Sequence, residues 1–339
     1  MYYCSNYVLA VALCVVTMLC WGSWGNTQKL AGKTWRYELF YWDYVLGLVL
    51  FSFLAGMTMG SSGGGAWSFV ANLKSSSAAQ WMWPFLGGVV FNASNILLSA
   101  AIAVAGMSVA FPVGVGLALV GGTVANRFVD GKGDPLLLWT GLAVIVASIV
   151  CNAFAFKAKE SCAGAASDAS TVRKGLVLSV CAGLLMSWFS PLVNRVVDMN
   201  FANPAPGSGF MTPYTAFFVF TLGVFASNFI FNTIMMRKPV SGAPLKGADW
   251  FKGGLLVHLV GIIGGAIWAT GTLLSFVTAG TAGAAIAYAL GQGAMLVSAI
   301  WGIFVWKEFK GAPKSAGVLN AAMIVLFCAG IALIIAAGR

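Results

Sequence analysis

The sequence is poor in charge. Lys, Arg, Asp and Glu together make up 8% of its 339 residues, and only nine residues are acidic. A soluble globular domain carries about 25% charged residues, whereas 60% of this chain is hydrophobic. A water-soluble fold with so little polar surface would expose large apolar patches. The shortage of charge therefore predicts an all-α integral membrane protein.

Motifs for metal, redox and phosphate chemistry are missing as well. There is one histidine, and the seven cysteines lack CxxC spacing, so we interpret them as small hydrophobic residues. Gly32-Lys33-Thr34 resembles the end of a phosphate-binding loop, but six residues separate it from Gly25 where the motif requires four. We expect no metal, no cofactor, no nucleic-acid partner and no enzymatic activity.

Long apolar runs are abundant. A helix that crosses the hydrocarbon layer needs about 20 apolar residues. No gap between the runs is long enough for a soluble catalytic domain. The first run is not preceded by the basic segment of a signal peptide, so we interpret it as a retained helix. The predicted spans are 5–23, 37–59, 82–104, 107–127, 135–156, 174–197, 211–236, 251–277, 283–306 and 315–337.

The positive charges separate by side when the loops between these ten spans are counted alternately. Fourteen fall on one side: Lys29, Lys33, Arg36, Lys157, Lys159, Arg173, Lys174, Arg237, Lys238, Lys246, Lys252, Lys307, Lys310 and Lys314. Five fall on the other: Lys74, Arg127, Lys132, Arg195 and Arg339. The positive-inside rule then predicts a multi-pass protein of the plasma membrane (the inner membrane of a bacterium) with both termini outside.

The two halves of the chain resemble each other. Leu97-Leu-Ser99 recurs as Leu273-Leu-Ser275, and Leu46-Gly47 recurs as Leu222-Gly223, both at a shift of 176 residues. Five spans per half is an odd number, so the second half would be inverted in the membrane, a common construction of secondary transporters. We expect an N-terminal five-helix repeat over 1–157, a cytoplasmic linker over 158–172 and a C-terminal five-helix repeat over 173–339.

Two titratable residues lie inside predicted spans. Asp43 follows Phe40-Tyr-Trp, and His258 lies in Leu256-Val-His-Leu259. An Asp within a span is costly, and such residues usually serve a function, so both are candidates for proton coupling. Because each lies only six or seven residues from a cytoplasmic end, Asp43 facing the headgroups beside an aromatic belt is the alternative interpretation.

Uncharged polar residues recur on single helix faces and suit a cavity for a hydrogen-bonding solute. Asn92 and Asn95 share a face of the third span, Asn194 belongs to a similar stripe on the sixth, and Tyr288 and Gln292 are paired on the ninth. Hydrogen bonding between helices is the alternative, since it is common in membrane bundles.

Two indoles in the segment Cys20-Trp-Gly-Ser-Trp-Gly-Asn26 are further candidates. Trp21 and Trp24 could stack on a planar or sugar-like ring at a helix break made by the glycines, or anchor the end of the helix at the interface. Trp268, which the repeat aligns with Asn92, is another candidate for the substrate site.

The chain resembles the ureide permease family of the drug/metabolite transporter superfamily, and more distantly the bacterial glucose/ribose and rhamnose–proton permeases. The similar stretches are Tyr41-Trp-Asp-Tyr44, Gly87 to Asn95, Gly106 to Val109, Ser190-Pro191 with Asn194, Pro213 to Phe218, and Trp301-Gly-Ile303 with Glu308.

The resemblance implies ten helices in two inverted repeats and proton-coupled uptake of heterocycles such as allantoin and uracil, or of monosaccharides in the sugar relatives. The long charged central loop of the plant ureide permeases is missing, because Lys157 to Lys174 is only 18 residues. We therefore expect an importer of a small neutral polar solute driven by protons, with a monosaccharide permease as the near alternative. A drug or metabolite exporter and a membrane scaffold or intramembrane enzyme are the alternatives of other classes.

Overall fold

The computed structural model describes residues 2–32, 35–62, 65, 67–105, 110–162, 169–201 and 210–338. Over these residues ten helical segments are long and apolar enough to cross a bilayer, which confirms the predicted number of spans. The elements are α1 (Tyr7–Ala31), α2 (Tyr37–Met57), α3 (Phe69–Ser75), α4 (Ala78–Ala105), η1 (Phe111–Val115), α6 (Gly116–Asp130), α7 (Pro135–Cys162), α8 (Ala169–Asn194), α9 (Pro213–Arg237), η2 (Gly247–Lys252), α10 (Leu255–Ala282), α11 (Ala284–Gly291), α12 (Ala294–Ile300), η3 (Trp301–Val305) and α13 (Lys314–Ala337).

The first span is longer than its apolar run. The sequence places the end of this helix near residue 23 with a break at Gly22 or Gly25, but α1 continues without interruption to Ala31. Its last two turns are polar and yet buried: Asn26, Thr27 and Gln28 are each at most 9% exposed. The expected helix break is therefore wrong, because protein rather than lipid surrounds these turns and polar side chains are tolerated there.

Two other spans are irregular. The fourth begins with the π-helical turn η1 and continues as α6, and the ninth consists of α11, α12 and the π-helical turn η3. The ninth span is interrupted at Gln292 and Gly293, between the end of α11 and the start of α12. Non-helical backbone at membrane depth is tolerated only where protein or a cavity surrounds it.

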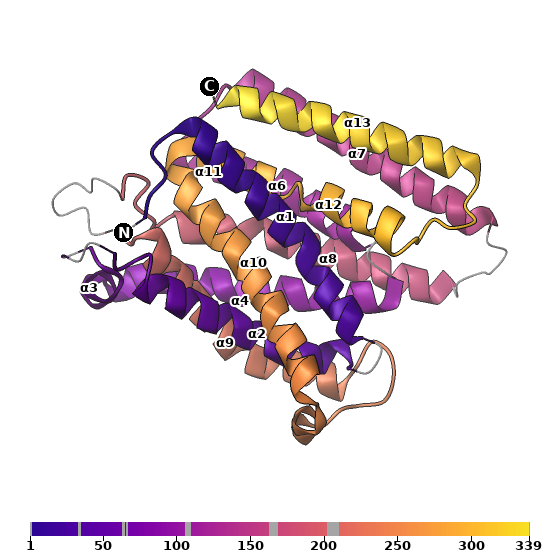
Figure 1. Ribbon diagram of the computed structural model, residues 1–339, viewed down its shortest axis with the longest axis horizontal. Coiled ribbons are helices and arrows are strands. Elements are labelled where there is room, and N and C mark those ends of the chain that lie inside the picture. The colour runs from indigo at the N-terminus through magenta and orange to yellow at the C-terminus, as the bar shows by residue number, and fades with distance from the viewer. Residues whose placement is uncertain are drawn as a thin grey trace.

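The long helices form one bundle with both chain ends at the same end of it, as Figure 1 shows. The helices α7 and α13 pair along one edge, and α1 and α10 lie side by side. We call the end where α1, α7 and α9 finish and α2 and α10 begin the basic face, because its loops carry most of the Lys and Arg residues.

The helix pairings have the symmetry that two related five-helix units require. The helices pair as α1–α10 and α8–α4, as α2–α10 and α9–α4, and as α1–α12 and α8–α6. When each helix is exchanged for its counterpart five spans away in the other half, the first pairing of each of these three sets becomes the second. The remaining large pairings, α2–α9, α6–α11 and α7–α13, are each converted into themselves. The arrangement is consistent with the inverted repeat that the sequence predicts.

Glycines bring the equivalent helix pairs into backbone contact. A Cβ on Gly265 of α10 would lie 2.0 Å from the carbonyl oxygen of Tyr44 on α2. At the equivalent crossing, a Cβ on Gly88 of α4 would lie 2.0 Å from the carbonyl oxygen of Phe220 on α9. Small residues permit such approach in lipid, where no hydrophobic force drives helices together.

The predicted linker over 158–172 is largely helical where it is described. The helix α7 extends to Cys162 and α8 begins at Ala169. Residues 163–168 lie outside the described residues, and so does the stretch Gly106 to Val109 on which part of the family resemblance rests.

The crossing of α2 and α10 yields a test. We expect Gly265→Ala to lower the thermal stability of the detergent-solubilised protein, because the added methyl would meet backbone atoms and overpacking costs about 1–3 kcal/mol. Gly317→Ala is the control, since a Cβ at this position of α13 meets nothing within 4 Å. Equal melting temperatures for the two variants, measured by tryptophan fluorescence, would show that the crossing tolerates separation.

Candidate functional site

A small cavity lies at the centre of the bundle, where helices of both halves of the chain meet. Its volume is about 20 Å³, which is space for one water molecule and no larger solute. Its lining consists of Trp21, Trp24, Phe91, Asn95, Leu98, Phe111, Val115, Met186, Phe189, Trp268, Gln292 and Ala294.

Aromatic rings form most of the wall. The rings of Trp21 and Trp268 are nearly parallel, with their centroids 6.0 Å apart and 14° between their planes, and Phe91 lies 4.2 Å from Trp268. The indole of Trp21 is held by a hydrogen bond of 2.9 Å from its Nε1 to Oγ1 of Thr272. Flat ring faces in a fixed orientation suit stacking on a planar heterocycle or on the apolar face of a sugar.

Two amides supply polar groups to the same cavity. Nδ2 of Asn95 donates to the hydroxyl of Tyr41 at 3.3 Å, while its Oδ1 is buried and has no partner in the protein. Gln292 is 2% exposed and lies at the interruption of the ninth span. Substrate sites of secondary transporters are often built at such discontinuous helices. An unpaired buried acceptor is costly, so a hydrogen-bond donor on a bound solute would have a ready partner.

The structure brings together four of the seven residues that the sequence suggests for substrate binding: Trp21, Asn95, Trp268 and Gln292 line the cavity. Tyr288 lies immediately behind this wall. Its ring meets that of Trp21 edge-on at 6.3 Å, and its hydroxyl lies 3.2 Å from the carbonyl oxygens of Ala118 on α6 and Met186 on α8, either of which can accept its one hydrogen.

Asn92 and Asn194 lie elsewhere. Asn92 is one helical turn from Asn95, but its Nδ2 donates to Oγ of Ser227 on α9 at 2.9 Å. Asn194 belongs to a network near the opposite face, where its Nδ2 donates to Oδ1 of Asn126 at 2.9 Å. Both bonds join helices, which is the alternative that the sequence leaves open for these stripes.

Some wall residues carry no polar signal in the sequence. Phe91, Phe189 and Met186 read as ordinary apolar positions of a span, and only the three-dimensional arrangement gathers them. Trp24 is 2% exposed and lines the cavity, so it does not anchor the helix at the membrane interface.

The two candidates for proton coupling lie in direct contact. Nδ1 of His258 on α10 is 2.8 Å from Oδ1 of Asp43 on α2. Asp43 is completely buried, so it does not face the headgroups. Because an ionised carboxylate only accepts, Nδ1 of His258 is the donor of this hydrogen bond whenever Asp43 is ionised.

Two indoles complete the shell of Asp43. Nε1 of Trp250 donates to Oδ1 at 2.8 Å, and Nε1 of Trp35 donates to Oδ2 at 3.2 Å. These donors satisfy a carboxylate that would otherwise be buried at high cost. The sequence gives no sign of Trp250, and it suggests an aromatic belt for Trp35, which is in fact 7% exposed.

A vestibule of about 660 Å³ opens on the basic face and approaches both sites. Its wall includes Trp35, which contacts Asp43, and Gln28, one turn along α1 from Trp24 in the central cavity. Nε2 of Gln28 donates to the carbonyl of Ser99 on α4 at 3.1 Å. One turn along α1 from Gln28, the ring of Trp24 packs against that of Tyr44, with the ring centroids 5.0 Å apart.

Ion pairs stand at the mouth of the vestibule. Lys29 pairs with Glu308 and lies over the ring of Trp306. Arg36 pairs with the buried Glu38 at 2.5 Å and also donates to the carbonyl of Ser241 in the loop after α9. The charges of the vestibule are thus compensated locally.

The comparisons with known proteins agree with this arrangement. Residues 165–337, just over half of the chain, match the family described as ureide permease. Ureide permease 1 of Arabidopsis thaliana is 24% identical over 381 residues, which cover 96% of each chain. An L-rhamnose-proton symporter of Escherichia coli O1:K1 / APEC is 28% identical over 211 residues, which cover 59% of this chain and 61% of the symporter.

The fold also occurs in a solved structure. A protein known from its crystal structure superposes with a TM-score of 0.60 over 97% of this chain and 96% of its own, at 16% identity. With the family match and the full-length similarity to the Arabidopsis permeases, the chain belongs to the ureide permease family.

Proposed function

We propose that the protein is a proton-coupled secondary transporter, and not an enzyme, that imports a small neutral polar solute by alternating access. The observation that carries the proposal is the central cavity. Its described lining is aromatic, amide and aliphatic and contains no charged residue, and it is assembled from both halves of the chain. A wall without fixed charge favours a neutral solute, since an ionic one would lose its hydration without compensation.

Asp43 and His258 are the proton-coupling pair in this proposal. The pair bridges α2 and α10, and these helices also carry Tyr41, which bonds Asn95 of the cavity, and Trp268 of the cavity wall. A change in the protonation of the pair therefore alters the contact between two helices that shape the cavity. Trp35 joins Asp43 to the wall of the vestibule, which opens on the basic face.

The solute that we favour is a ureide or nucleobase-like heterocycle, with a monosaccharide as the alternative. Stacked indoles and amides suit both classes. We prefer the heterocycle to the monosaccharide because of the relatives. The similarity to ureide permease 1 extends over 96% of the chain, whereas that to the L-rhamnose-proton symporter extends over 59%.

The conformation corresponds in this proposal to an occluded carrier with its vestibule toward the basic face. We place the basic face in the cytoplasm, by the positive-inside rule, and both termini outside the plasma membrane. The two five-helix repeats would rock against each other to open the cavity alternately to either side.

Binding at the central cavity can be tested by thermal stabilisation. A screen of the purified protein against ureides, nucleobases and monosaccharides including L-rhamnose should identify a ligand, because ligands stabilise by mass action. We expect Asn95→Ala and Gln292→Ala each to weaken the apparent affinity for it about tenfold, the equivalent of one hydrogen bond.

Asn194→Ala is the matched control, because this amide is equally buried but bonds Asn126 outside the cavity. Its apparent affinity should stay within about twofold of the wild-type value. A ligand whose stabilisation survives both cavity variants would place the substrate site elsewhere and favour a scaffold or an enzyme.

Proton coupling can be tested in proteoliposomes. With an inward proton gradient we expect wild-type protein to accumulate the ligand and Asp43→Asn to lose gradient-driven accumulation and its pH dependence, because the buried pair no longer exchanges a proton. Ligand-induced stabilisation of this variant should persist.

Asp249→Asn is the control on the same face. The pKa of Asp249 is held below its ordinary value, first by the hydrogen bond from Lys252 and then by the backbone amide of Lys246. This exposed carboxylate therefore stays ionised throughout the neutral range and does not titrate during transport. Unchanged proton-driven uptake by Asp43→Asn would contradict the coupling role, and absence of uptake by the wild type under this gradient would favour an exporter.

A further inference from the structure

A second hollow, separate from the transport path, lies on the lateral surface of the bundle near the basic face. It is a groove of about 840 Å³ between α2, α9 and the segment that contains η2. Its size is that of a pocket for an organic ligand. The groove opens on the side of the bundle, among side chains that a bilayer would cover, such as Phe229, which is 56% exposed.

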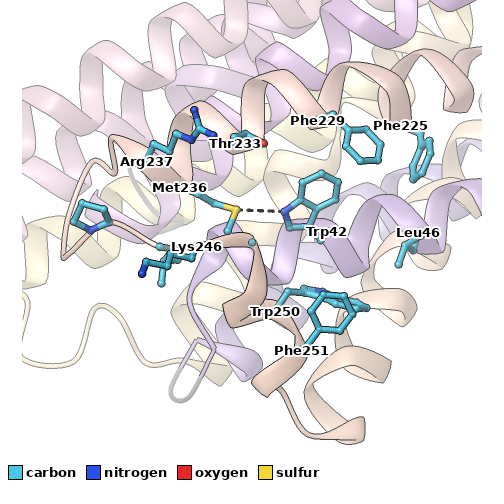
Figure 2. Close-up of a pocket in the computed structure, with 13 residues that line it drawn as sticks. Trp42, Leu46, Phe225, Phe229, Thr233, Met236, Arg237, Lys246, Trp250 and Phe251 are labelled. Atoms are coloured by element: carbon cyan, nitrogen blue, oxygen red, sulfur yellow. Dashed lines mark hydrogen bonds between the residues drawn. The ribbon is translucent and has the colours of Figure 1, made fainter.

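The two ends of the groove differ chemically. Figure 2 shows Arg237 and Lys246 at one end, and Phe225 and Leu46 at the other. Among the described residues, no ion pair within 4.0 Å involves Arg237 or Lys246; the nearby carboxylate of Asp249 pairs with Lys252 at 2.6 Å and accepts from the backbone amide of Lys246, so it acts on the Lys246 ammonium only at longer range. The cationic end is thus free for an anion.

The length of the apolar part matches one leaflet of a bilayer. Phe225 and Arg237 are twelve residues apart on α9, which corresponds to about 18 Å along the helix. Half of a hydrocarbon core is about 15 Å thick. An anion bound at Arg237 and Lys246 at the headgroup level can therefore extend a hydrocarbon chain along the groove past Thr233 as far as Phe225.

The floor of the groove touches the proton-coupling pair. Trp250 lines the groove, its ring lies 4.5 Å from that of His258, and its Nε1 donates to Asp43. Trp42 also lines the groove, and its Nε1 contacts Sδ of Met236 at 3.4 Å, as Figure 2 shows. Whatever fills the groove packs against the indole that holds Asp43 in place.

From these observations we propose that the groove is a binding site for an anionic phospholipid of the leaflet at the basic face. The phosphate binds Arg237 and Lys246, one acyl chain occupies the groove, and the bound lipid holds Trp250 against Asp43. A second copy of the chain suits the groove poorly. A two-fold contact across the groove would bring Arg237 and Lys246 of one copy close to the same cations of the other, and like charges repel. Clustered cations between membrane helices are typical sites for acidic headgroups.

The test uses the purified protein in dodecyl maltoside, titrated with dioleoyl phosphatidylglycerol. We expect a saturable rise in melting temperature that dioleoyl phosphatidylcholine does not produce. The double variant Arg237→Gln, Lys246→Gln should need about 30-fold more lipid for half of the effect, roughly fivefold for each cation. The matched control Lys310→Gln, Lys314→Gln removes two cations of the same face outside the groove and should behave like the wild type.

A further variant separates the chain from the headgroup. Thr233→Phe fills the groove without removing a charge, and it should reduce both the stabilisation and the quenching of tryptophan fluorescence by phosphatidylglycerol brominated in its acyl chains. Glycerol phosphate alone should not stabilise the protein.

Three outcomes would overturn the proposal. An equal loss in the control pair would show adsorption to the whole basic face, and full stabilisation by glycerol phosphate would show a site for a free phosphate. A lipid-free dimer that Thr233→Phe dissociates would show that a second copy covers the groove. None of these measurements uses transport, so they test the lipid site independently of the proposed transport function.

Discussion

The contact between the backbones of α2 and α10 is the constraint on which the functional parts of the molecule depend. Gly265 removes the side chain that would keep the two helices apart. The same approach brings Asp43 within hydrogen-bonding distance of His258, and a Cβ on Gly261 would lie 2.4 Å from Cβ of Asp43. A wider crossing would separate carboxylate from imidazole and leave the buried Asp43 with only its two indole donors, and removing one partner of a buried charged pair is destabilising.

The equivalent crossing of α4 and α9 has the same glycine contact but no titratable pair. At this crossing Asn92 donates to Ser227, and both atoms of the Asn228 amide are buried without a protein partner. The two crossings are thus alike in backbone and different in chemistry. In the proposed mechanism only the α2–α10 crossing exchanges protons, through a pair to which each half of the chain contributes one residue.

Much of the fold could be predicted from the sequence, because hydrophobic length and the separation of positive charges both depend on the bilayer. Ten spans were recognisable for this reason. The exceptions are places where protein replaces lipid as the surroundings. The polar end of α1 around Gln28, the interruption at Gln292 and the π-helical turn at Phe111 are all buried against other helices, so the rules of lipid exposure do not apply to them.

The candidate site was predictable only in part. Asp43 and His258 stand out as titratable residues inside apolar runs, and Trp21, Asn95, Trp268 and Gln292 as polar or indole residues there. Asn95 lines the cavity and Asn92 lies one turn away, yet a single sequence does not distinguish them because both belong to the same polar stripe. Their different roles depend on the hydrogen-bond partners that neighbouring helices offer to each amide. Trp250 was hidden for another reason: it lies in a loop segment, far along the chain from the carboxylate that it holds.

The small volume of the central cavity has an electrical consequence. A space for one water molecule, lined by the rings of Trp21, Phe189 and Trp268, is too small for an ion with its hydration shell. The membrane potential places about 2.3 kcal/mol per 100 mV on each elementary charge that crosses. At this point of the described bundle, the energy stored across the membrane is therefore not lost to the passage of hydrated ions.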